Sequence, residues 1–177
     1  AAADKLAAYT LPLGVVAQLF RAIAGKKPGV ITSVGLGTFA DPRSEGCKAN
    51  TKARTQGREV VQLIELNGSE YLFYPAFPLD ICFLRGTYAD EDGNISVEHE
   101  GLTGTELEIA AAVHNSGGTV VVQVEDVVQR GTIHPRKVRI HNTLVDYVVK
   151  APSPELHMQN YAGTGYQPAL TGETRCP

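Results

Sequence analysis

Three runs of strand length are apolar at nearly every position: Leu79–Leu84, Thr119–Val124 and Leu144–Val149. Such runs are typical of strands that are buried on both faces of a parallel sheet. Between the first two runs, Thr103–Ala112 is predicted to be a helix, with Thr103 as its cap and Glu106 completing a capping box. Because parallel neighbours need a long crossover, the pattern predicts an α/β domain with an open, largely parallel sheet and flanking helices.

The N-terminal part of the chain predicts a helix, a strand and a hairpin. Apolar residues recur at three- and four-residue spacing over Pro12–Ala24, which indicates a helix, and Val30–Val34 is strand-like. Asn67-Gly68 separates two β-rich runs, Glu59–Leu66 and Ser69–Tyr74. Asn-Gly is the strongest short-range hairpin signal, so we expect a β-hairpin insertion beside the parallel sheet.

The length of 177 residues suits one domain with one sizeable core, which we place at about residues 9–150, with 151–177 as a loop or docking tail. The net charge is −3 and no basic block stands out, which argues against nucleic-acid and membrane-surface partners. There is no signal peptide and no apolar run of membrane-spanning length, so a cytoplasmic location is expected. The chain lacks an initial Met and ends abruptly, and we expect it to be a fragment.

Residues 34–43, Val-Gly-Leu-Gly-Thr-Phe-Ala-Asp-Pro-Arg, form a segment that we call the glycine loop. Gly35 and Gly37 allow a sharp turn and bring backbone N–H groups close to a ligand. The loop has neither the third glycine of a dinucleotide fingerprint nor the Gly-Lys-Ser/Thr of a phosphate loop, so on its own a tight turn is the favoured interpretation. Residues 41–57 are predicted to be a long surface loop.

Ligands of open α/β sheets bind beyond the carboxyl ends of the strands. The loops that follow Val34, Leu84 and Val124 are therefore candidate walls of a site.

The usual catalytic constellations are missing or weak. The five histidines show no zinc-ligand spacing, and surface positions are favoured for all of them: His99, His114, His134, His141 and His157.

The cysteines Cys47, Cys82 and Cys176 fit neither a disulfide framework nor a metal site, and a nucleophilic Cys47 is a minor alternative. Glu98 and Glu100, on one face of a strand with His99 opposite, and Glu125-Asp126 could do acid–base work, although solvated or capping roles are favoured. We expect no metal and no cofactor.

Six segments occur in an order that resembles the family I CoA-transferases, especially the single-chain acetate/propionate group: Tyr9–Val15, Val34–Arg43, Glu70–Pro78, Arg85–Ile95, Asn115–Gly118 and Gln123–Glu125. The resemblance extends from Tyr9 to about Glu173. It implies two similar α/β halves with a fold shared with ribose-5-phosphate isomerases, and it matches this chain to the later part of the α-like half. It also implies short-chain fatty acid or ketone body metabolism, and an oligomeric enzyme.

The resemblance further implies a ping-pong reaction in which coenzyme A is a substrate. A glutamate of a Glu-Asn-Gly motif in the β-like half attacks the acyl-CoA thioester and carries CoA as a glutamyl-CoA thioester. This chain has no such motif, so no catalytic residue is assigned, the fragment alone is expected to be inactive, and the β-like half or the remaining polypeptide is the expected partner.

The candidate substrate-binding residues are Gly35, Gly37, Thr38 and Phe39 of the glycine loop, with Asp90 and Asn94 either shaping the same wall or fixing a turn. Two alternatives stay open. One is a non-catalytic, transferase-like ligand-binding or scaffold domain, and the other is a sugar-phosphate isomerase of the same fold, whose Asp and Lys motif is not visible.

Overall fold

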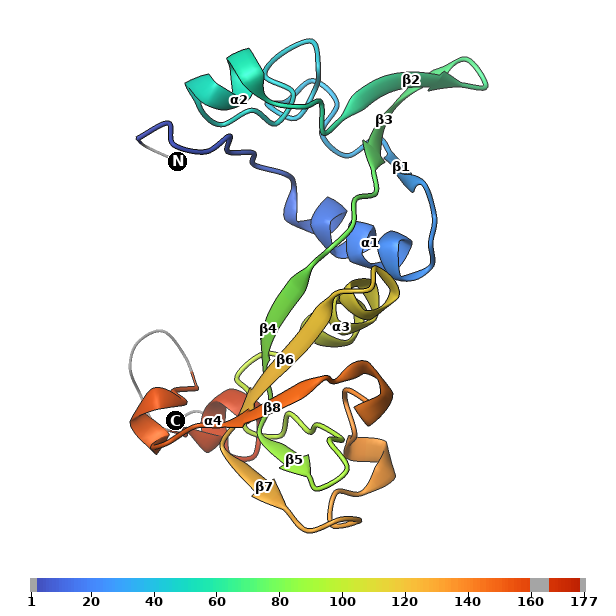
Figure 1. Ribbon diagram of the computed structural model, residues 1–177. Coiled ribbons are helices and arrows are strands. Elements are labelled where there is room, and N and C mark those ends of the chain that lie inside the picture. The colour runs from blue at the N-terminus through green and yellow to red at the C-terminus, as the bar shows by residue number, and fades with distance from the viewer. Residues whose placement is uncertain (1–2, 160–165, 176–177) are drawn as a thin grey trace. The chain divides into compact units, whose positions relative to one another are not determined.

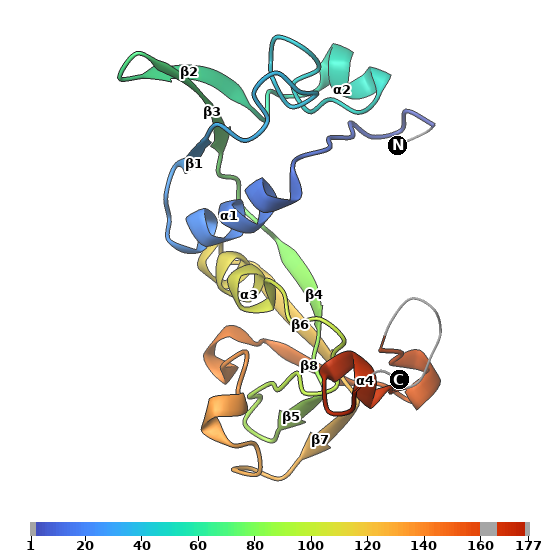
Figure 2. The same ribbon diagram turned by 180° about the vertical axis from the view of Figure 1, so that it is seen from behind.

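The computed structural model describes residues 3–159 and 166–175, and the elements are labelled in Figure 1 and, from behind, in Figure 2. The chain divides into two compact units, Ala1–Pro78 and Leu79–Pro177. Each unit has its own hydrophobic cluster, one around Leu19, Leu72 and Tyr74 and the other around Val120, Val122 and Ile95. The buried apolar residues of the described chain thus group into two clusters, whereas the sequence predicted one core over about residues 9–150.

The first unit contains α1 (Leu13–Ala24), which confirms the predicted helix. Val15, Leu19 and Ile23 recur every four residues, so they share one face of the helix, and that face is buried. Pro12 precedes the helix, where its missing N–H costs no hydrogen bond, and Gly25 follows the last residue.

The sheet of the first unit is antiparallel throughout. Its order is β1 (Gly29–Thr32), β3 (Ser69–Pro75) and β2 (Gln62–Leu66), as Figure 1 shows. Asn67 and Gly68 connect β2 to β3 with φ angles of 52° and 74°, as both positions of a type I′ turn require. The hairpin is confirmed, but it pairs with β1 in a sheet of its own.

A short helix, α2 (Thr51–Gln56), lies within the predicted surface loop 41–57. The side chain of Asn50 caps it by accepting a hydrogen bond from the Ala53 N–H at 3.0 Å. Six residues are too few to give an apolar periodicity, which is why the pattern predicted an irregular loop.

The second unit contains a parallel sheet in the order β4 (Ile81–Arg85), β6 (Thr119–Val124) and β8 (Tyr147–Lys150). The helix α3 (Glu106–Asn115) connects β4 to β6 and packs against both, as seen in Figure 1. A second parallel pair, β5 (Tyr88–Asp90) and β7 (Asp126–Val128), lies beyond the ends of β4 and β6. These elements confirm the α/β class and the parallel sheet.

Two details of this unit differ from the prediction. The helix begins at Glu106 rather than Thr103, because Glu106 Oε1 accepts the Gly104 N–H at 2.6 Å and Thr105 stands at the cap. The strand β4 is not buried on both faces, since Cys82 is buried whereas Phe83 is 76% exposed. The continuous apolar run thus predicted the strand correctly, but the prediction that both of its faces are buried is wrong.

The segment after β7 contains short helical turns: η1 (Pro135–Lys137), η2 (Asn142–Leu144), η3 (Pro154–Leu156) and α4 (Pro168–Thr171). The predicted tail 151–177 thus holds two of these turns within its described part, and Cys176 lies outside the described residues. Among the described residues, no helix has the length and apolar character needed to span a membrane.

Candidate functional site

The glycine loop, in the first unit, is built around a close contact between Gly35 and Tyr74. Gly35 has a φ of 104°, and a Cβ atom there would lie 2.6 Å from the Tyr74 hydroxyl. The Tyr74 hydroxyl donates a hydrogen bond of 3.0 Å to the Val34 carbonyl. Only glycine fits this approach, so Gly35 fixes the path of the loop as it leaves β1.

Asp41 closes the glycine loop from inside. Its buried carboxylate accepts hydrogen bonds from the Gly37 N–H at 2.9 Å and from Arg43 Nη2 at 2.8 Å. Arg43 Nη1 also donates to Glu70 of β3 at 3.0 Å. Hydrogen bonds from the Arg43 side chain, followed by those from the Gly37 and Arg43 backbone, hold the pKa of Asp41 well below its usual range. The sequence interpretation gave Asp41, Arg43 and Glu70 no role, although Asp-Pro-Arg begins four residues after Gly37.

Thr38 and Phe39 occupy the turn of the loop. The Thr38 hydroxyl donates to the Gly35 carbonyl at 2.8 Å, so it stabilises the turn. The Phe39 ring is 44% exposed. Within residues 3–159 and 166–175, the N–H groups of Gly35 and Phe39 donate no hydrogen bond, whereas the Gly37 N–H is used by Asp41. The loop therefore offers two backbone donors and one exposed aromatic ring.

Asp90 and Asn94 lie in the second unit and fix a turn. Asp90 Oδ1 accepts the Asn94 N–H at 2.9 Å, and Asp90 Oδ2 accepts Asn94 Nδ2 at 3.0 Å. Asn94 Oδ1 in turn accepts the Asn142 N–H at 3.1 Å. The side chains thus tie the turn after β5 to η2, and a role in substrate binding stays a prediction, as it does for the four glycine-loop residues.

The loops after β4 and β6, both predicted as walls, do meet in the second unit. Glu125 follows β6, and its Oε2 lies 2.9 Å from Nδ1 of His99. The His99 ring stacks on Tyr166, with ring centroids 4.0 Å apart. Arg85, at the end of β4, pairs with Glu100 at 3.2 Å. Glu98 and Glu100 lie in a turn and bend region rather than on a strand, so the predicted strand face is wrong.

His157 is buried, which contradicts the surface position predicted for it. Its Nδ1 lies 3.2 Å from Gln123 Nε2, and its Nε2 lies 3.5 Å from Glu100 Oε1. Gln123 thus contacts Nδ1 from 34 positions away in the sequence, whereas the buried Nε2 has no hydrogen-bond partner among the described residues. Local pattern therefore carried no signal for this cluster of Arg85, Glu100, Gln123 and His157.

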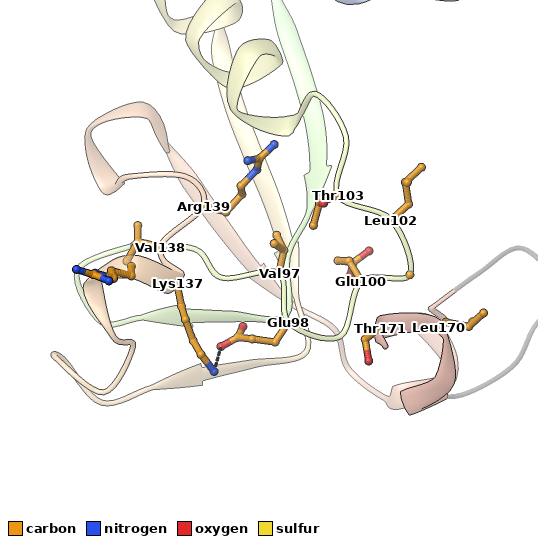
Figure 3. Close-up of a pocket in the computed structure, with 12 residues that line it drawn as sticks. Val97, Glu98, Glu100, Leu102, Thr103, Lys137, Val138, Arg139, Leu170 and Thr171 are labelled. Carbon is orange, nitrogen blue, oxygen red and sulfur yellow. Dashed lines mark ion pairs between the residues drawn. The ribbon is translucent and has the colours of Figure 1, made fainter. Parts of the chain in front are cut away.

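A cavity of about 510 Å³ lies beside this cluster. Figure 3 shows the side chains that line it, with Glu98 pointing toward Lys137. Lys137 Nζ lies 3.8 Å from Glu98, and Arg139 Nη2 lies 3.3 Å from Glu106. Within the lining, Lys137 and Glu98 pair with each other, whereas Arg139 pairs with Glu106 and Glu100 pairs with Arg85, both of which lie outside the lining. The remaining lining is mixed: Val97, Glu100, Gly101, Leu102, Thr103, Arg136, Val138, Leu170 and Thr171.

The described residues hold no cluster of three or more His, Cys, Asp or Glu side chains suited to a metal ion. Burial raises the pKa of the Cys47 thiol to about 11, and its side chain is enclosed in the core of the first unit. A buried, protonated thiol is a poor nucleophile. The minor alternative of a nucleophilic Cys47 therefore has no support in the geometry.

Residues 1–151 match the family model of the coenzyme A transferases. The chain belongs to this family. It is 51% identical over 175 residues to caffeate CoA-transferase of Acetobacterium woodii, covering 99% of this chain and 33% of that protein. It is 40% identical over 170 residues to the acetate CoA-transferase YdiF of Escherichia coli K12, covering 96% of this chain and 31% of that protein.

The fold agrees with solved coenzyme A transferases. The acyl-CoA transferase YdiF of E. coli O157:H7, in its thioester complex with CoA, superimposes with a TM-score of 0.89 at 39% identity, covering 98% of this chain and 34% of that one. Glutaconate coenzyme A-transferase of Acidaminococcus fermentans, at 20% identity and a TM-score of 0.68, shares the fold. The chain spans about a third of the length of these curated relatives.

Proposed function

We propose that this chain is the α-like part of an enzyme that moves CoA from a short-chain acyl-CoA to a carboxylate acceptor. The observation that carries the proposal is the 51% identity to a CoA-transferase along 99% of the chain. The acetate CoA-transferase, at 40% identity, supports the same reaction class. The proposed reaction would transfer CoA, as a thioester, from one carboxylate to another, and it would need no resident cofactor.

The proposed reaction is ping-pong, with its nucleophile outside this chain. A glutamate carboxylate of the β-like half attacks the thioester carbonyl, which forms an acyl–glutamyl anhydride and releases CoA thiolate. The thiolate then attacks the glutamyl carbonyl, which releases the first carboxylate and leaves glutamyl-CoA. An acceptor carboxylate reverses both steps. The complete exchange replaces one thioester by another of similar energy, so the site mainly has to orient the groups and stabilise oxyanions.

In this reaction the glycine loop would contact the acyl group or the acceptor carboxylate. The N–H groups of Gly35 and Phe39 have no partner within the described part of the chain, and the Phe39 ring is exposed beside them. Backbone N–H donors of this kind stabilise a negatively charged oxygen without reorganising. The hydrogen bonds of Asp41 to Gly37 and Arg43 would keep the donors in place.

The experiment is reconstitution. The 177-residue chain is mixed with the remaining polypeptide of the same enzyme, and transfer of CoA from acetyl-CoA to propionate is measured. We expect transfer by the mixture and none by either piece alone, together with a shift to an oligomer on gel filtration. No transfer by two folded, associated pieces would contradict the proposal and favour a non-catalytic ligand-binding or scaffold domain.

A further inference from the structure

One face of the parallel sheet in the second unit is covered by α3, which lies against β4 and β6 (Figure 2). On this side Cys82, Val120 and Val122 of the strands share a hydrophobic cluster with Ala110 and Val113 of the helix. Successive side chains of a strand point to opposite faces of the sheet. The residues between these buried ones therefore lie on the other face.

That other face is apolar and exposed. The register of the sheet places Phe83 of β4 beside Val121 of β6, and Val121 beside Tyr147 of β8, so the three side chains form a row across all three strands. Phe83 is 76% exposed and Tyr147 is 63% exposed. Ile81 and Val149, on the same face, are 51% and 47% exposed. We call these five residues the open face.

The polar side chains beside the open face already have partners. Gln123 Nε2 donates to the Leu156 carbonyl at 2.8 Å, and Arg85 Nη2 pairs with Glu100 at 3.2 Å. The surface therefore offers apolar contact rather than an unpaired charge. Parallel sheets are normally covered on both faces, and a contiguous exposed apolar patch marks a site of protein contact.

The dimensions of the open face suit a single helix. Three strands about 4.8 Å apart place the outer two about 10 Å from each other, which is the diameter of one helix with its side chains. From Ile81 to Arg85 the strand β4 extends about 13 Å, or a little more than two helical turns. On the opposite side of the sheet, α3 fills a comparable area with 10 residues.

We propose that the open face docks one amphipathic helix of the transferase polypeptide that lies outside this chain, with the apolar stripe of that helix on Phe83, Val121 and Tyr147. The proposal rests on the proposed function, which requires such a polypeptide. This chain spans about a third of the length of its curated relatives, so most of their length is available to supply the helix. Parallel sheets are covered by helices, which favours this occupant over the same face of a second copy.

Hydroxyl-radical footprinting, read by mass spectrometry, tests the proposal without a substitution. The 177-residue chain is oxidised alone and after mixing with the remaining polypeptide of the same enzyme. We expect Phe83 and Tyr147 to be oxidised in the chain alone and to react about tenfold more slowly in the mixture, because the core of an interface excludes water. Protection of both rings in the chain alone, or no protection in the mixture, would overturn the proposal.

Variants test the same contact by affinity. Phe83→Asp and Tyr147→Asp should each weaken association of the two pieces about tenfold, since each puts a charge into the centre of the interface. Leu107→Asp is the matched control, because Leu107 is an exposed apolar residue of α3, on the other side of the sheet, and it should associate like the unmodified chain. Circular dichroism checks that each variant is folded.

Equal association by Phe83→Asp and Leu107→Asp would contradict the proposal. Self-association of the chain that Phe83→Asp abolishes would also overturn it, because a second copy would then occupy the face. CoA transfer by a mixture in which Phe83 stays accessible would overturn this proposal and leave the proposed function intact. Protection of Phe83 in a mixture without transfer would support the docking and contradict the proposed function.

Discussion

The Asp41 carboxylate lies 2.8 Å from Nη2 of Arg43, two residues further along the chain, and the same carboxylate accepts the N–H of Gly37. One buried acid thus joins the turn of the glycine loop to an arginine that also reaches Glu70 on β3. This arrangement makes the loop dependent on a single ionised group.

Stability should therefore depend on pH through Asp41. Its pKa is lowered in the folded state, so its contribution is present above the unfolded value of about 4 and is lost as the pH falls below it. Asp41→Asn should lower the thermal midpoint at pH 7 and flatten the decline of the midpoint between about pH 5 and pH 2. Thermal scans across this range measure both effects, and parallel curves for the two proteins would refute the assignment.

Gly35→Ala should destabilise the first unit by about 1–3 kcal/mol, because the new Cβ would meet the Tyr74 hydroxyl at 2.6 Å and the backbone has a φ of 104°. Gly37→Ala is the matched control. Its φ is 70°, but a Cβ there has nothing within 4 Å, so the cost should stay near about 1 kcal/mol. Urea unfolding measures the free energy of unfolding that each variant loses. Equal losses would mean that backbone strain alone accounts for the effect, and they would rule out a contribution from the contact with Tyr74.

The buried face of α1 predicts a large difference between two leucines of the same helix. Leu19 is 2% exposed, and Leu19→Ala should cost about 2–5 kcal/mol through lost burial and a cavity. Leu13 is 84% exposed, and Leu13→Ala should change the free energy of unfolding by no more than about 0.5 kcal/mol. Chemical denaturation followed by circular dichroism makes the comparison. If Leu13→Ala instead lowered the free energy of unfolding as strongly as Leu19→Ala, the prediction would be contradicted. Leu13 would then have to pack against a partner on the outer face of α1.

Cys47 should be unreactive in the folded chain. With its pKa raised to about 11 by burial, only roughly one thiol in a thousand is ionised at pH 8, and the side chain is enclosed. A variant that keeps Cys47 and replaces Cys82 by Ala and Cys176 by Ser should react with iodoacetamide only after unfolding. Rapid labelling of the native protein would show that the Cys47 pocket opens.

The elements with a clear local pattern were predictable, whereas a helix that depends on a single cap, a contact that depends on the shape of a turn, and pairs of distant residues were not. The helix α1 and the Asn67-Gly68 turn follow from spacing and from backbone preferences of single residues. The helix α2 depends on one Asn50 cap, and the pairing of His99 with Glu125 joins residues 26 positions apart. Likewise, Asp41 gains its role only when the turn of the glycine loop brings the Gly37 N–H and the Arg43 side chain to its carboxylate.

The claim that this chain completes a CoA-transferase is tested most directly by trapping the intermediate. The 177-residue chain is mixed with the remaining polypeptide, acetyl-CoA is added without an acceptor, and intact mass spectrometry is recorded. We predict a mass increase of one covalently attached CoA on the remaining polypeptide, present only when this chain is included and removed by adding propionate. An adduct that forms equally well without this chain, or no adduct in an associated mixture, would contradict the account.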